Sequence, residues 1–117
     1  MTAVHPEARA GDILLVDLAP TRGTEQSGTR LVLVISNEFM HEKTTRAIIC
    51  PITGNMNPWP TKLPLPGGMK TKGMVLCDQV RTIDRKARSL RTIENVGPDF
   101  LHLVRAYVGR LIELDVD

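Results

Sequence analysis

The polar stretch between residues 23 and 30 is where this sequence first suggests chemistry. The run GTEQSGTR brings together a carboxylate, Glu25, an amide, Gln26, and a guanidinium, Arg30, directly before the apolar run LVLVIS. A loop that only turned the chain would need Gly, Asn, Asp or Pro and little more. The two glycines of the run can adopt positive φ, so they allow the loop to fold back over a strand end.

Glu25 and Arg30 together have the groups that phosphate chemistry requires. The planar guanidinium fork of Arg30 matches phosphate oxygens and stays charged at any relevant pH. Glu25 can act as a base if burial raises its pKa towards neutrality. A second interpretation is that the two side chains form an ion pair that only fixes the loop. The residues alone leave both interpretations open.

Three other chemistries do not fit the sequence. A two-metal hydrolase needs several converging carboxylates, which the middle of the chain does not offer, and no cofactor motif of the P-loop type occurs. A nucleophilic triad needs a histidine near a hydroxyl or thiol. His5, His41 and His102 lie outside the polar stretches and are predicted to be surface residues. We therefore expect neither a metal nor a cofactor.

The net charge of +2 hides an uneven distribution. Residues 43–91 hold ten Lys and Arg against two Asp, a net +8, and the flanks hold five basic and eleven acidic residues, a net −6. A basic middle is typical of a face that binds a polyanion. The same charges could equally be scattered over a solvated surface, so the sequence leaves both arrangements open.

The apolar pattern predicts a mainly β chain that ends in a helix. The expected strands are 11–18, 31–36, 46–52, 73–80 and about 92–96, with a brief edge strand at 62–65 inside an irregular connection, 54–72. Asn37 is a plausible N-cap for a short helical turn, and Pro98 suits the first turn of an amphipathic helix that reaches Leu111. We expect one domain over residues 1–117, a small, mostly antiparallel barrel.

The remaining composition indicates a cytoplasmic protein. The N-terminal residues lack the apolar region of a signal peptide, and no apolar run approaches the roughly 20 residues of a membrane span. Cys50 and Cys77 are too few for a disulfide scaffold, and their spacing matches no zinc motif. They are expected to be free, buried thiols.

Four segments taken together resemble one family. GDILLVDLAPTRGTEQSGTR, LVLVISN, IICPIT and GMVLCDQVRTIDRKAR occur in that order within residues 11–88 and are similar to the MazF/PemK/Kid toxin ribonucleases. The resemblance implies an SH3-like β-barrel with small helices and a C-terminal α-helix, and a homodimer. It also implies metal-independent, sequence-specific cleavage of single-stranded RNA, leaving a 2′,3′-cyclic phosphate and a 5′-hydroxyl. The partner would be a cognate antitoxin.

The resemblance also assigns site residues. Arg30 occupies the arginine position implicated in phosphate binding and catalysis, and Thr53 matches the threonine that accompanies it. Glu25 and Asp78 compete for the role of general base. Leu76 stands where one branch of the family has a catalytic arginine, which favours Glu25. The expected RNA-binding residues are Thr24, Gln26, Trp59, Lys62, Lys72, Gln79, Arg81 and Arg88.

Some of these assignments have alternatives. Trp59 can stack on a base, or it can plug the barrel rim or a dimer contact. Arg85 and Arg88 can hold phosphates or be structural. The whole chain can be a non-catalytic toxin of the same barrel fold, such as a gyrase poison. The gyrase poison that this chain resembles in fold acts through a C-terminal Trp-Gly-Ile, whereas this chain ends ELDVD.

Overall fold

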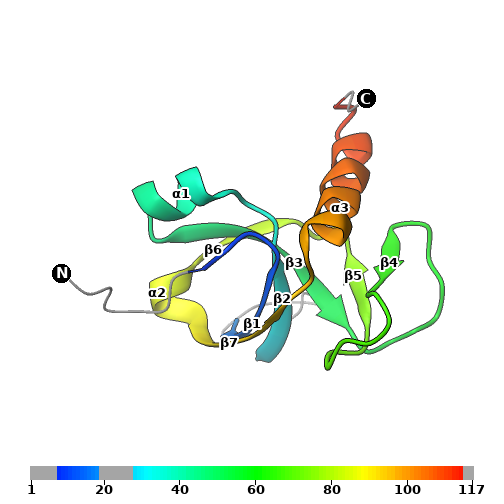
Figure 1. The fold of residues 1–117 in the computed structure, drawn as a ribbon, viewed down its shortest axis with the longest axis horizontal. Helices are drawn as coiled ribbons and strands as arrows, with labels where there is room; N and C mark the ends of the chain where they lie inside the picture. The colour runs from blue at the N-terminus through cyan, green and yellow to red at the C-terminus, as the bar shows by residue number, and fades with distance from the viewer. Residues whose placement is uncertain (1–7, 19–27, 115–117) are drawn as a thin grey trace.

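A computed structural model describes residues 8–18 and 28–114, and Thr24, Glu25 and Gln26 lie outside these ranges. The described chain is a curled antiparallel sheet with two small helices and one longer helix that projects from its rim (Figure 1). The strands are β1 Asp12–Asp17, β2 Thr29–Val34, β3 Arg46–Thr53, β4 Lys62–Pro64, β5 Met74–Leu76, β6 Arg81–Asp84 and β7 Ser89–Asn95. The helices are α1 Glu38–Lys43, α2 Arg85–Arg88 and α3 Pro98–Leu111.

The strand order is β4-β5-β3-β2-β1-β7, and β6 pairs with β3 beside β5. The first half of β3 pairs with β6 and its end pairs with β5, so one long strand carries two neighbours on the same edge. Within the described residues these pairings curl the sheet without closing it into a complete ring. The expected mainly β fold, with small helices and a C-terminal helix, is confirmed.

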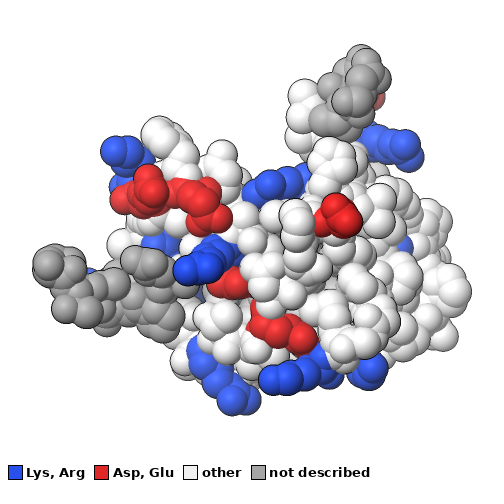
Figure 2. Space-filling view, viewed as in Figure 1, with Lys and Arg blue, Asp and Glu red and all other residues white. Residues whose placement is uncertain are grey.

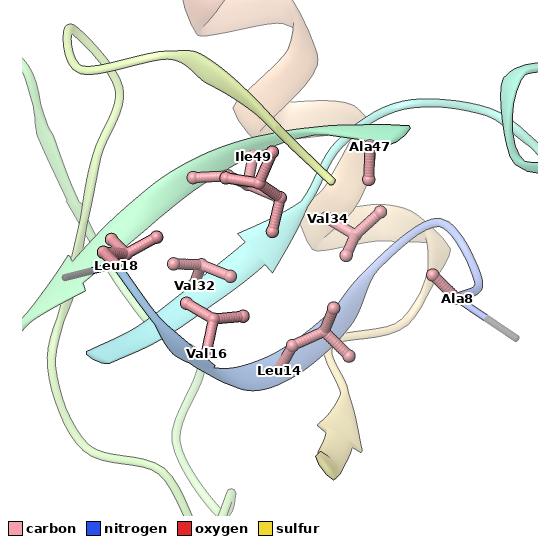
Figure 3. Packing of buried hydrophobic residues seen from close by; sticks show 9 residues of the cluster. Ala8, Leu14, Val16, Leu18, Val32, Val34, Ala47 and Ile49 are labelled. Atoms are coloured by element: carbon pink, nitrogen blue, oxygen red, sulfur yellow. The ribbon is translucent and has the colours of Figure 1, made fainter. Parts of the chain in front are cut away.

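Strand β2 is central because it is apolar on both faces. Val32 and Val34 point into one core cluster with Leu14 and Val16 of β1 (Figure 3). Leu33 points the other way, into a second cluster that α3 covers. The amphipathic pattern of α3 therefore buries its apolar stripe on the sheet, as the sequence predicts.

Two helix starts follow the sequence prediction closely. The Asn37 side chain accepts a hydrogen bond from the Met40 N–H at 3.1 Å and caps α1. Helix α3 begins at Pro98, whose missing N–H costs nothing in a first turn.

Several expected boundaries were wrong. Strand β2 begins at Thr29 and so includes Arg30, whereas the sequence predicted a strand that begins one residue after Arg30. The strand expected at 46–52 ends one residue later, because β3 continues to Thr53. Strand β5 ends at Leu76, where the Gln79 N–H donates to the Leu76 carbonyl in a turn.

Candidate active site

The register between β2 and β3 indicates how Arg30 and Thr53 lie relative to each other. Val34 pairs with Ile49 and Val32 pairs with Pro51 on β2 and β3. Continuing the same antiparallel register by two residues sets Arg30 opposite Thr53, on the same face of the sheet. Directly opposite residues have Cβ atoms about 4.5–5.5 Å apart, so both side chains can reach one phosphate group.

The arginine is held by the strand that carries it. Arg30 pairs with Val16 of β1, and the Leu18 N–H donates to the Gly28 carbonyl at 2.9 Å, which fixes the entry into β2. Gly28 has the positive φ, 76°, expected of it. The Nε atom of Arg30 is buried and has no hydrogen-bond partner among the described residues. The guanidinium is thus half-buried, with donors still available.

The Thr53 hydroxyl can donate a hydrogen bond to a ligand. Thr53 Oγ1 accepts the Asn55 N–H at 3.1 Å, so its own O–H remains free of an acceptor among the described residues. Beside it, Gly73 allows β5 to approach β3 closely, because a Cβ at this position would lie 2.6 Å from the Thr53 carbonyl oxygen. The strand pair around Thr53 therefore depends on a residue without a side chain.

A pocket of about 560 Å³ opens next to the end of β3. Its lining residues come from the loop after β3, from β4 and from the turn after β5: Asn55, Asn57, Pro58, Trp59, Thr61, Lys62, Leu76, Asp78 and Gln79. Leu76 pairs with Lys62, and Met74 two residues earlier pairs with Thr53. Because residues two apart share a face, the pocket floor is continuous with the face that carries Thr53.

The loop that forms one wall of this pocket is tied down. Lys62 Nζ donates to the carbonyls of Asn57 at 3.1 Å and Asn55 at 3.3 Å. The Tyr107 hydroxyl of α3 donates to the Pro60 carbonyl. Trp59 lies on this loop with 64% of its surface exposed, so it forms a wall of the pocket and does not plug the barrel rim.

The other predicted RNA-binding residues are spread over several elements. Arg81 on β6 pairs with Ile49 and shares a face with Ile83, and it is half-buried. Lys72 and Gln79 are exposed. Arg88 donates to the Asp17 carbonyl at 3.4 Å, which ties it to the end of β1. On the face seen in Figure 2, basic side chains form several separate groups with acidic ones between them.

Arg85 is a structural residue. It is buried, and its guanidinium donates to the carbonyls of His41, Thr44 and Arg46 at 2.8–3.3 Å. Burial lowers the pKa of this guanidinium, and the nearby Asp84 carboxylate acts in the opposite direction. This arginine joins α1, β3 and α2 and does not serve a phosphate.

His41 was wrongly predicted to be a surface histidine. Only 5% of its side chain is exposed, and its Nε2 lies 2.6 Å from Ser36 Oγ while its Nδ1 lies 3.3 Å from Glu38 Oε1. The order resembles a nucleophilic triad. However, Ser36 is buried and its Oγ accepts the Ile48 N–H at 3.0 Å, so the hydroxyl is part of the packing between β2, α1 and β3.

Sequence reasoning missed Asn57 and Thr61 as pocket residues. A polar Asn and Thr between prolines carry little signal until a fold places them around a cavity. No group of three or more potential metal ligands gathers among residues 8–18 and 28–114. None of the helices in these ranges is long and apolar enough to cross a membrane.

Comparisons with known proteins agree with this geometry. Residues 9–112 match the sequence profile of the PemK-like, MazF-like toxins of type II toxin–antitoxin systems. The endoribonuclease PemK of Escherichia coli is 40% identical over 105 residues, which cover 86% of this chain and 77% of the relative.

Two solved structures are also similar. MazF of Deinococcus radiodurans superimposes with a TM-score of 0.84 at 29% identity, covering 92% of this chain and 98% of the other. MazF in a MazE–MazF crystal structure from the same organism gives a TM-score of 0.81 at 29% identity, with 94% and 99% covered.

Proposed function

Because this chain belongs to the PemK-like, MazF-like family of type II toxins, it is an endoribonuclease toxin, and we propose that Arg30 and Thr53 form the centre of its active site. The observation that supports this proposal is the β2–β3 register, which pairs Val32 with Pro51. Extended by two residues, that register would set Arg30 opposite Thr53 on one face. The pocket beside Trp59 is lined by Asn55, two residues after Thr53, and by Leu76, two residues after the β5 partner of Thr53. A cation and a hydroxyl at the entrance to a groove for bases are what RNA cleavage needs.

The reaction proceeds by attack within the substrate. The RNA 2′-oxygen forms a bond to the adjacent phosphorus as the bond from phosphorus to the 5′-oxygen breaks. The 2′-hydroxyl proton goes to a carboxylate, for which we favour Glu25 over Asp78. The departing 5′-oxygen takes up a proton from water, and the carboxylate returns its proton to solvent after the reaction. The products are a 2′,3′-cyclic phosphate and a 5′-hydroxyl, so the protein supplies no nucleophile.

Arg30 and Thr53 stabilise the charge that develops on the phosphorane oxygens. Arg30 acts as a charged donor clamp, because a guanidinium stays charged in proteins and offers donors in a fixed fork. Its buried Nε without a partner among the described residues supports this role, since an unpaired donor carries a penalty of about 1–3 kcal/mol that a phosphate oxygen would remove. The Thr53 hydroxyl adds a second donor, because its acceptor side already holds the Asn55 N–H.

The RNA follows the same face of the sheet. We propose that Arg81, Lys72 and Arg88 attract its phosphates and that Trp59 stacks on a base. Lys62 contributes charge while its ammonium is held by two loop carbonyls, so it organises the loop as well. Thr24 and Gln26 would meet the RNA from the loop outside the described residues.

The partners follow from the family and from the surface. We propose that an antitoxin neutralises this toxin by covering the RNA face, and that the chain acts as a homodimer in the cytoplasm, where its RNA is found. Leu103 and Leu111 leave an apolar strip of α3 exposed, which Leu114 extends just beyond the helix, and a second copy of the chain would cover it. No cofactor enters this scheme.

The test is a cleavage assay on a long single-stranded RNA in the presence of EDTA, with analysis of the fragment ends. Discrete cuts with 2′,3′-cyclic phosphate ends are expected. Arg30→Ala should lower the rate by about 10²–10³-fold, because it removes one preorganised donor. Arg110→Ala, which removes an exposed arginine on α3, is the matched control and should cleave normally. An Arg30→Ala protein that retains most of its activity would refute the scheme.

A further inference from the structure

The pocket beside β4 has the size and chemistry of a site for one nucleobase. Its volume of about 560 Å³ lies in the range of small-molecule sites. Leu76 and Pro58 line it with apolar surface, and the exposed indole of Trp59 offers a flat wall. Any nucleobase can stack on such a wall, because every base has a flat aromatic face, as in other single-stranded RNA sites.

Four polar side chains around this wall have no bonding partners within the described part of the protein. Among the described residues, none bonds to the side chains of Asn57, Asp78 or Gln79, although all three line the pocket. Thr61 also lines it, and its Oγ1 is buried without a hydrogen-bond partner in the same part of the chain. The loop itself is fixed by Lys62. The backbone is thus organised while the ligand-facing groups stay unused.

We propose that this pocket holds one unstacked RNA base and that Asp78 selects guanine there. This inference rests on the nuclease function proposed above and assigns Asp78 a recognition role in place of general-base catalysis. The two carboxylate oxygens can accept the N1–H and N2–H of guanine side by side. Adenine and cytosine offer one amino donor next to a ring acceptor, which would face the second oxygen. Uracil offers one N–H between two carbonyl groups.

Trp59 makes the test direct, because it is the only tryptophan in the chain. The protein is used in an Arg30→Ala background, so that no substrate is cut during titration. Short oligouridine RNAs with one guanosine, one inosine or no substitution are titrated while the indole fluorescence is followed. Inosine lacks only the 2-amino group of guanine, so the pair isolates a single hydrogen bond.

The guanosine RNA should bind about 5–100-fold more tightly than plain oligouridine, with inosine between the two. Asp78→Asn should remove this preference. Asp99→Asn, the same change at an exposed position on α3, should retain it. Equal binding of guanosine and inosine RNAs, or a guanine preference that survives in Asp78→Asn, would overturn the proposal.

A cleavage assay in the Arg30-containing protein separates recognition from catalysis. If Asp78 reads guanine, Asp78→Asn slows cleavage next to guanosine more than cleavage next to inosine, which keeps only the N1–H contact. If Asp78 were the general base, Asp78→Asn would lower both cleavage rates equally. That outcome would contradict the proposal. Because the titration needs no cleavage, failure of the nuclease function and failure of the guanine site are distinguishable.

Discussion

Replacing Gly73 by alanine tests how closely β5 must approach the strand that carries Thr53. Gly73 has a φ of 151°, which L-residues rarely adopt, and a Cβ there would lie 2.6 Å from the Thr53 carbonyl oxygen and 2.9 Å from Ile52 Cγ2. The first contact is with backbone, so no side chain can rotate away. The unfavourable backbone conformation costs about 1–2 kcal/mol, and the forced shift of β5 costs about 1–3 kcal/mol. We expect Gly73→Ala to lose about 2–5 kcal/mol of unfolding free energy.

Two other glycines separate these two costs. Gly68 has a φ of 84°, but no described atom lies within 4 Å of the position that a Cβ would take, so Gly68→Ala should lose only the conformational part, about 1 kcal/mol. Gly67 has open space as well and is not at positive φ, so Gly67→Ala should be neutral or slightly stabilising. Urea unfolding of the three variants, with RNA cleavage measured alongside, checks the order. If Gly73→Ala loses no more stability than Gly68→Ala, the close approach beside Thr53 does not constrain the site.

Three further changes probe other parts of the fold. Arg85→Met should lower the unfolding free energy by about 2–3 kcal/mol in urea melts, because three backbone carbonyls lose a charged donor. The Thr71 hydroxyl and neighbouring N–H groups lower the pKa of Glu94, so this carboxylate stabilises the fold above its ordinary pKa of 4.5 and the effect is lost as pH falls through the lower folded value. The melting temperature should therefore fall more steeply between about pH 5 and pH 3 for the wild type than for Glu94→Gln. Burial raises the pKa of Cys50 to about 12 and of Cys77 to about 11, so an aromatic disulfide reagent should modify neither thiol at neutral pH until the protein is unfolded.

The sequence predicts the elements whose pattern is local and long. The α3 stripe recurs along the whole helix, and the β2 run is apolar on both faces, so both are assigned correctly. Strand β6 and helix α2 were missed because each has only four residues. In β6 a single buried residue, Ile83, gives no alternation to detect. Arg85 in α2 is buried by contacts with distant carbonyls, which no local pattern can indicate.

The sequence predicts which residues form the candidate site, but it does not predict how the fold positions them. Arg30 and Thr53 are named by the family resemblance, but their opposition depends on the register between β2 and β3, which the sequence does not state. The two cysteines are correctly expected to be buried and free. The pocket around Trp59 needs the turn after β5 to bring Asp78 towards a loop some twenty residues earlier, and only the folded chain shows this.

Access decides which of the two polar constellations can react. Ser36, His41 and Glu38 have the order of a nucleophilic triad, yet Ser36 is only 7% exposed and its oxygen is occupied by the Ile48 N–H. A substrate carbonyl cannot reach that hydroxyl, so the arrangement stabilises α1 against the sheet. The proposed site at Arg30 and Thr53 supplies no nucleophile, and a pocket lies next to the end of β3, which carries Thr53. RNA brings its own 2′-hydroxyl, so a site that only binds phosphate, accepts one proton and holds a base is sufficient for cleavage.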